Sequence, residues 1–433
     1  MLYLLALIIA ISIGVLTLRL IVKDRLSHEL VLFLGSALGL GMVGQIIFYV
    51  QLIGHNFNFL LPPFLSLLIL GALIYLNKKA KNKLIILPKN SSLLILLILV
   101  IPLWMEALFF SYGGWDAWSC WNLKAKFIYL GHENWKDMFS PILWRSNTGY
   151  PLSLPTINVW FWQWTGFSQN VPMFNAILLT LLTAGVLLLG LQALQVPVLP
   201  AVIITLSVFT IAFGNTLCIS QYSDILFSLY LLCTFVCYLL FERSKDENIL
   251  ILSALFIGLL SFTKNEGLAA CGILFLLILI QRLKKPWTFI SIVFLAALPT
   301  IIFTLSLAPH SDAFINGLFS PDRPSTLERF LFILASILVE FIHLKWMGLW
   351  IVAILAIALG WKKAFQKPLM IIGLFMAAYL TVTIAYYQIN TFFGNISWWI
   401  DYTLNRIIFA LMPTVFLWVG ISCFSRKNSK KDV

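Results

Sequence analysis

The sequence predicts an all-helical membrane protein with about thirteen spanning helices and one large loop, after the fourth helix, on the extracytoplasmic side. Of the 433 residues, 61% are hydrophobic and 11% are charged, against roughly a quarter charged in soluble proteins. Apolar runs long enough to cross a hydrocarbon layer of about 30 Å recur along nearly the whole length. These runs do not alternate apolar with polar residues, which excludes a membrane barrel and leaves helices as the spanning structure.

The apolar runs give the helices in order. We expect spanning helices near residues 2–22, 30–50, 59–76, 93–110, 173–193, 197–213, 222–241, 249–263, 267–281, 288–307, 347–360, 368–388 and 407–424. The first run has no Lys or Arg before it and no small-residue cleavage site after it, so we expect a spanning helix and not a signal peptide. The apolar segment 329–343 is expected to be interfacial or re-entrant, because a crossing there would spoil the charge asymmetry described next.

Basic residues are divided unequally between the two sets of loops. Twenty of the 29 Lys and Arg fall on one side, although the other side contains every long loop. Cytoplasmic loops of membrane proteins are enriched in Lys and Arg, so this bias predicts a cytoplasmic C-terminus and an outside N-terminus in a bacterial plasma membrane. Eleven of the 17 acidic residues fall on the outer side. The net charge of +12 therefore follows the topology and does not indicate a nucleic-acid partner.

Three parts make up the predicted organisation. Residues 1–92 form N-terminal spanning helices and a cytoplasmic linker, residues 93–424 form the main membrane module with the outer loop at 111–172, and residues 425–433 form a basic cytoplasmic tail. The chain has no convincing internal repeat, so the inverted-repeat plan of many secondary transporters has no support.

The outer loop is unusually aromatic, with nine of the 16 tryptophans between Trp104 and Trp164. One interpretation is an interfacial belt, because Trp and Tyr favour the headgroup level. The other is a groove whose flat rings stack on a sugar or line a lipid chain. In that second interpretation the substrate contacts from this loop are Trp115, Trp118, Lys124 and Tyr150.

Asp116 is the candidate catalytic residue. It follows Gly113, Gly114 and Trp115 directly after a spanning helix, so a flexible turn places one carboxylate just outside the bilayer among bulky rings. A charge there is costly to desolvate unless it is paired or has a task. It could accept a proton from an attacking hydroxyl or hold a divalent cation. The alternative is a helix-capping role.

Two basic residues at the outer ends of predicted helices are candidates for binding a phosphate. They are Lys264, in Thr263-Lys264-Asn265-Glu266-Gly267, and Arg406, in Leu404-Asn405-Arg406. Both would stabilise a phosphate leaving group as charge develops on it. The alternatives are snorkelling to headgroups or ion pairs with nearby acids. Asp224 and Glu266 are expected to contact the substrate, although Asp224 could merely favour the positive end of a helix dipole.

Cysteine and histidine indicate no metal or redox site. The six cysteines are scattered, and Cys233 and Cys237, which share a helix face, are expected to be small core residues and not a functional thiol pair. The five histidines never cluster with zinc or haem spacing.

Taken in order, these motifs resemble the GT-C superfamily of membrane glycosyltransferases, in particular bacterial relatives of dolichyl-phosphate-mannose protein mannosyltransferase. The resemblance covers residues 93–424 and rests on five short motifs. They are Gly114-Trp115-Asp116, Tyr150-Pro151-Leu152-Ser153-Leu154-Pro155, Tyr222-Ser223-Asp224, Thr263-Lys264-Asn265-Glu266-Gly267, and Leu404-Asn405-Arg406 leading to Leu411-Met412-Pro413.

The resemblance implies an inverting transferase that takes its sugar from a polyprenyl-phosphate donor. Asp116 would then be the catalytic base or metal ligand, and Lys264 and Arg406 would hold the donor phosphate. Two departures stand out. Three helices, within residues 1–76, precede the region that carries the catalytic loop, one stretch of membrane more than the common plan, and their role is left open. The family's Asp-Glu pair is reduced to Asp116 followed by Ala117. The second departure weakens a metal-dependent version, and the sequence leaves any metal unassigned.

The sequence leaves other functions open. A transporter or flippase of a lipid-linked or amphipathic solute would use the same aromatic and basic residues, but it would place ionisable residues near the bilayer midplane. A polymerase that joins lipid-linked glycans would share the outer-loop chemistry. The acceptor of the sugar could be a glycan, a lipid or a protein.

Overall fold

The computed structural model describes residues 1–54, 60–82, 90–281, 283–309, 327–389 and 396–426, and within them all regular structure is helical. Nine of the described helices are long and apolar enough to cross a membrane. They are α1 (Leu2–Val22), α2 (His28–Ile53), α3 (Leu61–Lys79), α4 (Ile95–Phe109, with the turn η1, Ser91–Leu94, before it), α7 (Asn170–Ala193), α10 (Ser223–Ser244), α13 (Pro286–Ser306), α18 (Met370–Ile389) and α19 (Ile396–Phe424).

The remaining apolar helices are shorter or bent. α8 (Val198–Phe209), α11 (Glu247–Ser261) and α12 (Asn265–Leu279) are apolar but short, and α15 (Leu327–Ile342) meets α16 (Leu349–Leu359) at a bend of 114°. The bent pair is either one broken span, which would make ten crossings, or a re-entrant loop. Each of the thirteen ranges expected from the sequence contains a helix, but thirteen crossings remain a prediction.

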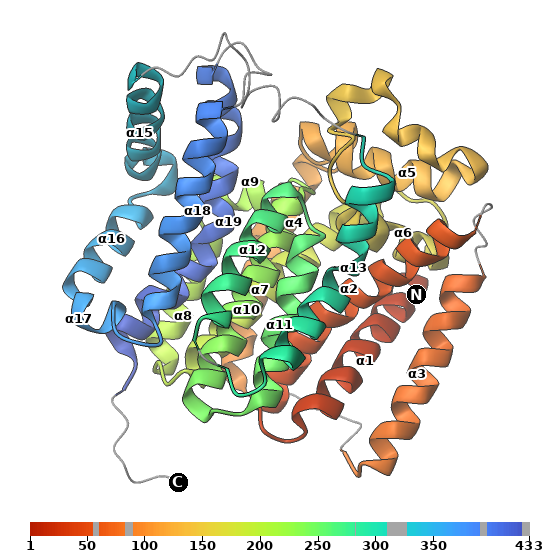
Figure 1. Ribbon diagram of the computed structural model, residues 1–433, viewed down its shortest axis with the longest axis horizontal. Coiled ribbons are helices and arrows are strands. Elements are labelled where there is room, and N and C mark those ends of the chain that lie inside the picture. The colour runs from red at the N-terminus through yellow and green to blue at the C-terminus, as the bar shows by residue number, and fades with distance from the viewer. Residues whose placement is uncertain (55–59, 83–89, 282, 310–326, 390–395, 427–433) are drawn as a thin grey trace.

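One helix, α10, forms the centre of the bundle (Figure 1). Every residue in its most apolar stretch is buried, and α7 and α19, which pack against it, are mostly buried as well. α3 lies at the periphery, where its apolar side chains are largely exposed. A helix that is apolar all round and buried on every side is typical of the centre of a bundle, whereas exposed apolar faces suit contact with lipid.

α1 and α2 pack closely through small residues. A Cβ on Gly14 would collide with the backbone of Gly35 and Gly39, and one on Gly39 would collide with the backbone of Ala10. Small residues that let two backbones approach are the usual contact between membrane helices, because lipid gives no hydrophobic force to drive them together. This pair also packs on α6 and so supports the cap described next.

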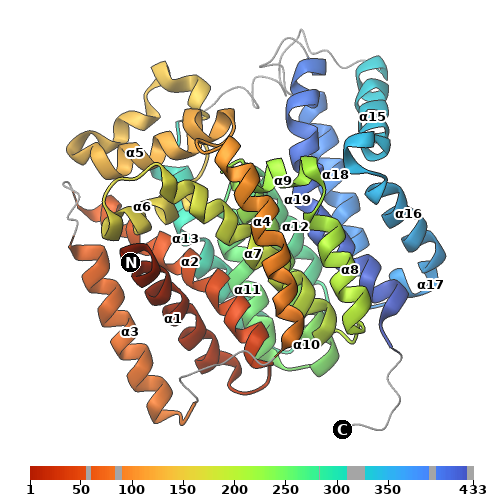
Figure 2. The ribbon, with the colours of Figure 1, turned by 180° about the vertical axis from the view of Figure 1, so that it is seen from behind.

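Residues 113–167 form a cap on one end of the bundle (Figures 1 and 2). The sequence indicated a loop here, and the structure has a series of short helices. They are η2 (Ala117–Trp121), α5 (Asn122–Leu130), η3 (His132–Phe139), η4 (Pro141–Ser146) and α6 (Ser153–Thr165). α6 is buried over ten consecutive residues and packs on α2, which explains why this stretch is so apolar.

The opposite end of the bundle contains the C-terminal end of α19 and the turn that joins α1 to α2 (Figure 1). There the turn after α1 is tied to the turn after α10, because Arg25 Nη1 lies 2.6 Å from Asp246 Oδ1. Several of the Lys and Arg residues counted above lie outside the described residues, at 83–89, 282 and 427–433. Most of the 308–328 loop also lies outside them. The short helices not yet named are α9 (Ala212–Ile219), η5 (Leu344–Trp346) and α17 (Trp361–Ala364).

Candidate functional site

Four charged residues from four distant motifs meet beneath the cap. The Arg406 guanidinium, on α19, lies between two carboxylates: Nη1 is 2.5 Å from Asp116 Oδ2, and Nη2 is 2.9 Å from Asp224 Oδ2. Arg406 Nε also donates to Asp224 Oδ2 at 3.1 Å. The Lys264 ammonium holds the other oxygen of Asp224, with Nζ to Oδ1 at 2.7 Å. The order of charges is therefore Asp116, Arg406, Asp224, Lys264.

The turn before Asp116 requires two glycines. Gly113 has φ +72°, a left-handed conformation that glycine adopts without strain, and a Cβ on Gly114 would collide with the Tyr222 hydroxyl. Gly114 N–H donates to the Ser220 carbonyl at 3.0 Å, so the turn pairs with the segment that leads into α10. The glycines thus allow two pieces of backbone, far apart in sequence, to approach and bring Asp116 to Arg406.

Tyr222 and Ser223 join the remaining motifs. The Tyr222 ring packs against the Arg406 guanidinium, with 4.2 Å from Cζ to the ring centroid, and its hydroxyl accepts from the Asp116 backbone N–H at 3.4 Å. The Ser223 hydroxyl donates to the Thr263 carbonyl at 2.8 Å, which fixes the turn between α11 and α12. Lys264 follows directly in extended backbone and precedes α12, so its side chain reaches Asp224.

Three of the four charged residues of this network are buried, and Arg406 is mostly buried. The exposed fractions are 7% for Asp116, 2% for Asp224 and 3% for Lys264, and the Arg406 side chain is 13% exposed. Removing ions from water costs several kcal/mol each, and only close pairing and further hydrogen bonds offset that cost. Asp224 meets this requirement on both oxygens and also lies in the first turn of α10, where the helix dipole favours an anion.

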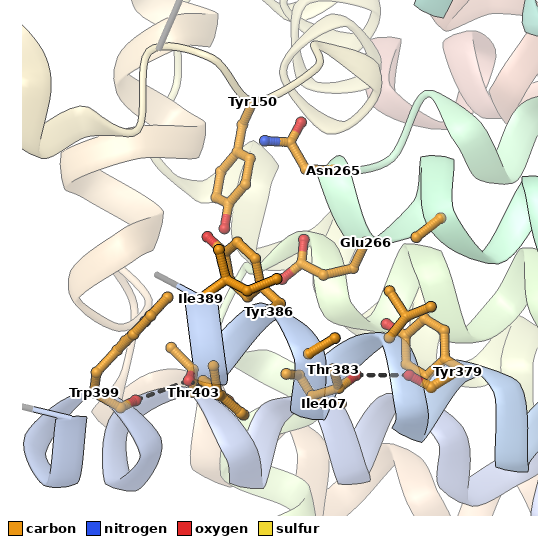
Figure 3. Close-up of a pocket in the computed structure, with 14 residues that line it drawn as sticks. Tyr150, Asn265, Glu266, Tyr379, Thr383, Tyr386, Ile389, Trp399, Thr403 and Ile407 are labelled. Carbon is orange, nitrogen blue, oxygen red and sulfur yellow. Dashed lines mark hydrogen bonds between the residues drawn. The ribbon is translucent and has the colours of Figure 1, made fainter. Parts of the chain in front are cut away.

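A cavity of about 300 Å³ lies beside the network, between α12, α18 and α19 (Figure 3). Its wall is aromatic. The rings come from Tyr150 in the cap, Tyr379, Tyr386 and Tyr387 on α18, and Trp399 on α19. The Tyr387 hydroxyl is 2.7 Å from the Thr403 hydroxyl, and the Trp399 ring packs edge-on against both Tyr386 and Tyr387. A mostly apolar cavity with a few polar groups is the usual form of a small-ligand site.

Glu266 connects the cavity to the network. Its Oε1 lies 3.8 Å from Lys264 Nζ, and its Oε2 is buried with no hydrogen-bond partner among the described residues. Figure 3 shows the carboxylate pointing into the cavity, toward Tyr150 and Tyr386. Because buried polar atoms in proteins are nearly always hydrogen-bonded, an oxygen in this position can accept a hydrogen bond from a water molecule or from a ligand in the cavity.

Lys124 and Tyr150 shape the cavity from the cap. Lys124 Nζ donates to the carbonyls of Asn147 at 2.8 Å and of Tyr150 at 2.9 Å, so it anchors the backbone that carries Tyr150. The Tyr150 ring stacks on Trp121 with centroids 5.4 Å apart and planes 3° apart. Burial lowers the pKa of the Lys124 ammonium and raises the pKa of the Tyr150 hydroxyl well above its ordinary value. Lys124 therefore positions Tyr150, and Tyr150 lines the cavity.

Trp115 and Trp118 lie away from the cavity. They pack edge-on against each other with centroids 4.3 Å apart, and about half of each side chain is exposed. Other tryptophans of the same stretch, such as Trp121, Trp160 and Trp162, are fully buried in the packing of the cap. The aromatic enrichment thus has two components in the structure: buried rings that build the cap, and exposed rings of the kind expected at a membrane interface.

A chain of buried side-chain hydrogen bonds ties the site to the first helix. From Gln221 it runs through Asn122 at 2.8 Å, Asn158 at 3.1 Å and Asn175 at 2.8 Å to the Tyr3 hydroxyl at 2.8 Å. Gln221 itself has φ +60° and lies next to Tyr222. Because each amide in this row forms a hydrogen bond with the next, the row of hydrogen bonds orients the segment that pairs with the Gly114 turn. The first helix therefore supports the site, a role that the sequence left open.

Cysteines form no cluster in the described part of the chain. All six are free, and all except Cys423 are buried, including Cys233 and Cys237, which lie within α10. Burial raises the pKa of the Cys120 thiol, in the cap, to about 11. Among the described residues, no group of three or more His, Cys, Asp or Glu side chains could hold a metal ion. Asp116 and Asp224 have the Arg406 guanidinium between them.

Sequence reasoning missed the contribution of α18. Tyr379, Thr383 and Tyr387 are four residues apart and therefore lie on one face of a helix, and that face lines the cavity. Trp399 was missed as well. The signals were present as two aromatic pairs, Tyr386-Tyr387 near the end of α18 and Trp398-Trp399 near the start of α19. No family model, curated protein or solved structure matches the chain.

Proposed function

We propose that the chain is an integral-membrane glycosyltransferase that moves a sugar from a polyprenyl-phosphate carrier to an acceptor on the extracytoplasmic side. The resemblance to the GT-C superfamily suggests this function. The observation that supports it best is the convergence of Asp116, Asp224, Lys264 and Arg406 in one buried network beside an aromatic cavity. The thirteen crossings, the outside N-terminus and the cytoplasmic tail in a bacterial plasma membrane belong to the same proposal.

The ion pairs suggest an order of events. With no ligand, the Arg406 guanidinium is shared by two carboxylates, so neither cation is free to receive a phosphate. A donor phosphate that approaches Arg406 Nη1 competes with Asp116, whereas Asp224 is held by Arg406 and Lys264 together. Asp116 is the carboxylate that such a phosphate displaces, because Arg406 is its only side-chain partner among the described residues. Donor binding would thereby release the carboxylate that the reaction needs.

The chemical step is then a displacement at the anomeric carbon. The acceptor hydroxyl oxygen forms a bond to that carbon as the bond from the carbon to the phosphate oxygen breaks, with inversion, and the hydroxyl proton passes to Asp116. Arg406 and Lys264 stabilise the charge that develops on the departing lipid phosphate. A carboxylate is a weak base, so its contribution is modest, about 10²- to 10⁴-fold. Positioning of donor and acceptor in the cavity supplies the rest.

The test is transfer of labelled sugar from a defined polyprenyl-phosphate donor by the detergent-purified protein. Asp116→Asn is expected to lower transfer by about 10²- to 10⁴-fold. Glu340→Gln is the matched control, because Glu340 pairs with Lys345 and Trp346 and does not line the cavity. Near-normal transfer by Asp116→Asn would overturn the mechanism.

A transporter or flippase for a lipid-linked solute is the second candidate, and the cavity wall favours it because α18 and α19 are both long enough to span the membrane. The same preparation separates the two candidates. Transport needs a sealed vesicle, whereas transfer proceeds in detergent. Movement of a labelled lipid-linked sugar across a vesicle, with no product in detergent, would replace the transferase proposal with the transporter.

A further inference from the structure

The cavity between α12, α18 and α19 carries one charge. Of the described residues that line it, Glu266 is the only acidic or basic one. Its Oε1 is 3.8 Å from Lys264 Nζ, but that ammonium makes its shorter contact, 2.7 Å, with Asp224. Oε2 is buried without a hydrogen-bond partner in the described structure. The lining is therefore negative, and its free oxygen accepts hydrogen bonds and donates none.

The cations near the cavity are already engaged elsewhere. Arg406 is held by Asp116 and Asp224. Arg329, on α15, donates through Nη2 and Nε to the Tyr387 carbonyl at 2.7 and 3.2 Å and does not line the cavity. An anionic group inside the cavity would thus meet Glu266 without a lining cation to offset the repulsion.

The remaining lining suits a hydroxylated ring. Aromatic faces from Tyr150, Tyr386 and Trp399 can stack on the apolar face of a sugar, and the Asn265 amide can pair with hydroxyl groups. The volume of about 300 Å³ is at the small end for ligand cavities, which suits one ring better than an oligosaccharide. A sugar hydroxyl or a protonated amine would satisfy Glu266 Oε2 as its donor.

We infer that this cavity holds the sugar that is transferred, that the sugar is neutral or carries an amino group, and that Glu266 excludes a sugar with a carboxylate. This inference rests on the proposed function, because it names the substrate class of the same site. Specificity of this kind comes from a repulsive element as much as from an attractive one. Glu266 provides both: it accepts a hydrogen bond from the correct ring and repels an acidic one.

The test is equilibrium binding, measured without turnover by native mass spectrometry of the detergent-purified chain. The probes are short-chain polyprenyl-phosphate donors that carry a neutral hexose, an amino-hexose or a hexuronate. Wild type is expected to bind the hexuronate donor at least tenfold more weakly than the hexose donor, and the amino-hexose donor at least as tightly as the hexose donor. In Glu266→Gln the hexuronate penalty should fall below about threefold, because the repelling charge is gone while the shape is kept.

The matched control is Glu340→Gln, which removes an acid that does not line the cavity and should leave the tenfold difference intact. Equal binding of all three donors by wild type, no binding of any of them, or an unchanged penalty in Glu266→Gln would each overturn the inference. A membrane lipid as the true occupant would give the first of these results. Discrimination by charge without transfer to any acceptor would support the inference and count against the transferase proposal alone.

Discussion

Ion pairs at the two ends of the bundle use the same residue types and differ in burial. At the end of the bundle where α19 ends, Arg25 pairs with Asp246 and Lys245 pairs with Glu242, and the basic side chains are 46% and 60% exposed. Beneath the cap, Arg406 and Lys264 pair with Asp116 and Asp224 at exposures of 13% or less. Exposed pairs are worth about 0–1 kcal/mol, whereas a partner removed from a buried pair leaves an uncompensated charge. The positions of charged residues in the sequence therefore indicate where ion pairs can form, whereas their burial determines how much each pair affects stability.

The largest expected difference in stability is between two variants that each remove one cation, one at each end of the bundle. Arg406→Met should destabilise the protein by about 3–5 kcal/mol, because it leaves Asp116 and Asp224 buried without their shared partner. Arg25→Met, which keeps similar volume at an exposed pair, should cost at most about 1 kcal/mol. Thermal unfolding of both variants in detergent measures the difference. Similar losses of stability in the two variants would show that the buried network is not the stronger of the two.

A smaller effect is expected at the glycine turn. Gly114→Ala should cost about 1–3 kcal/mol, because the new Cβ meets the Tyr222 hydroxyl and the turn must move away from Ser220. Gly71→Ala is the matched control: it lies within α3 with nothing near its Cβ position, so it should be neutral or stabilise by up to about 1 kcal/mol.

A second change localises the collision at the glycine turn. In a Tyr222→Phe background the cost of Gly114→Ala should shrink, because the atom nearest the new Cβ has been removed. The same unfolding measurement applies to all four proteins of the cycle. A cost that does not change with Tyr222→Phe would place the strain elsewhere in the turn.

The smallest expected change is in thiol labelling, which does not alter stability. It tests which end of the bundle faces the cytoplasm. Cys423 is exposed in the last turn of α19, whereas Cys120 is buried in the cap and burial raises its pKa to about 11. An impermeant maleimide at neutral pH should therefore leave the protein unlabelled in intact cells and label Cys423 in inverted vesicles. Cys423→Ser should abolish that label. Labelling of Cys423 from outside intact cells would reverse the predicted orientation.

The sequence predicted the helices well and the site in part. A helix occurs in every expected range because runs of about twenty apolar residues have few alternatives in a membrane. Asp116, Asp224, Lys264 and Arg406 were each singled out from single motifs, and the structure brings them together. The tyrosines of α18 and Trp399 were not predicted, because any aromatic residue near a helix end also suits the membrane interface.

The sequence did not predict which groups each side chain contacts. Lys124 was expected to touch a substrate, and in the structure its ammonium holds two backbone carbonyls of the cap. Trp115 and Trp118 were expected to line a groove, and the structure places them on an exposed face. A charged or aromatic residue in a polar loop gives the same local pattern whether it faces inward or outward, so only packing separates the two.

By itself, the sequence determined that this chain is helical and that it suits a membrane, and it predicted that most Lys and Arg lie in one of two alternating sets of loops. These properties follow from composition and local periodicity, which each segment carries independently. Only the tertiary structure decided that Arg406 lies between two carboxylates and that Glu266 directs a free oxygen into an aromatic cavity. Those contacts join residues up to 290 positions apart, and their geometry depends on how the helices pack.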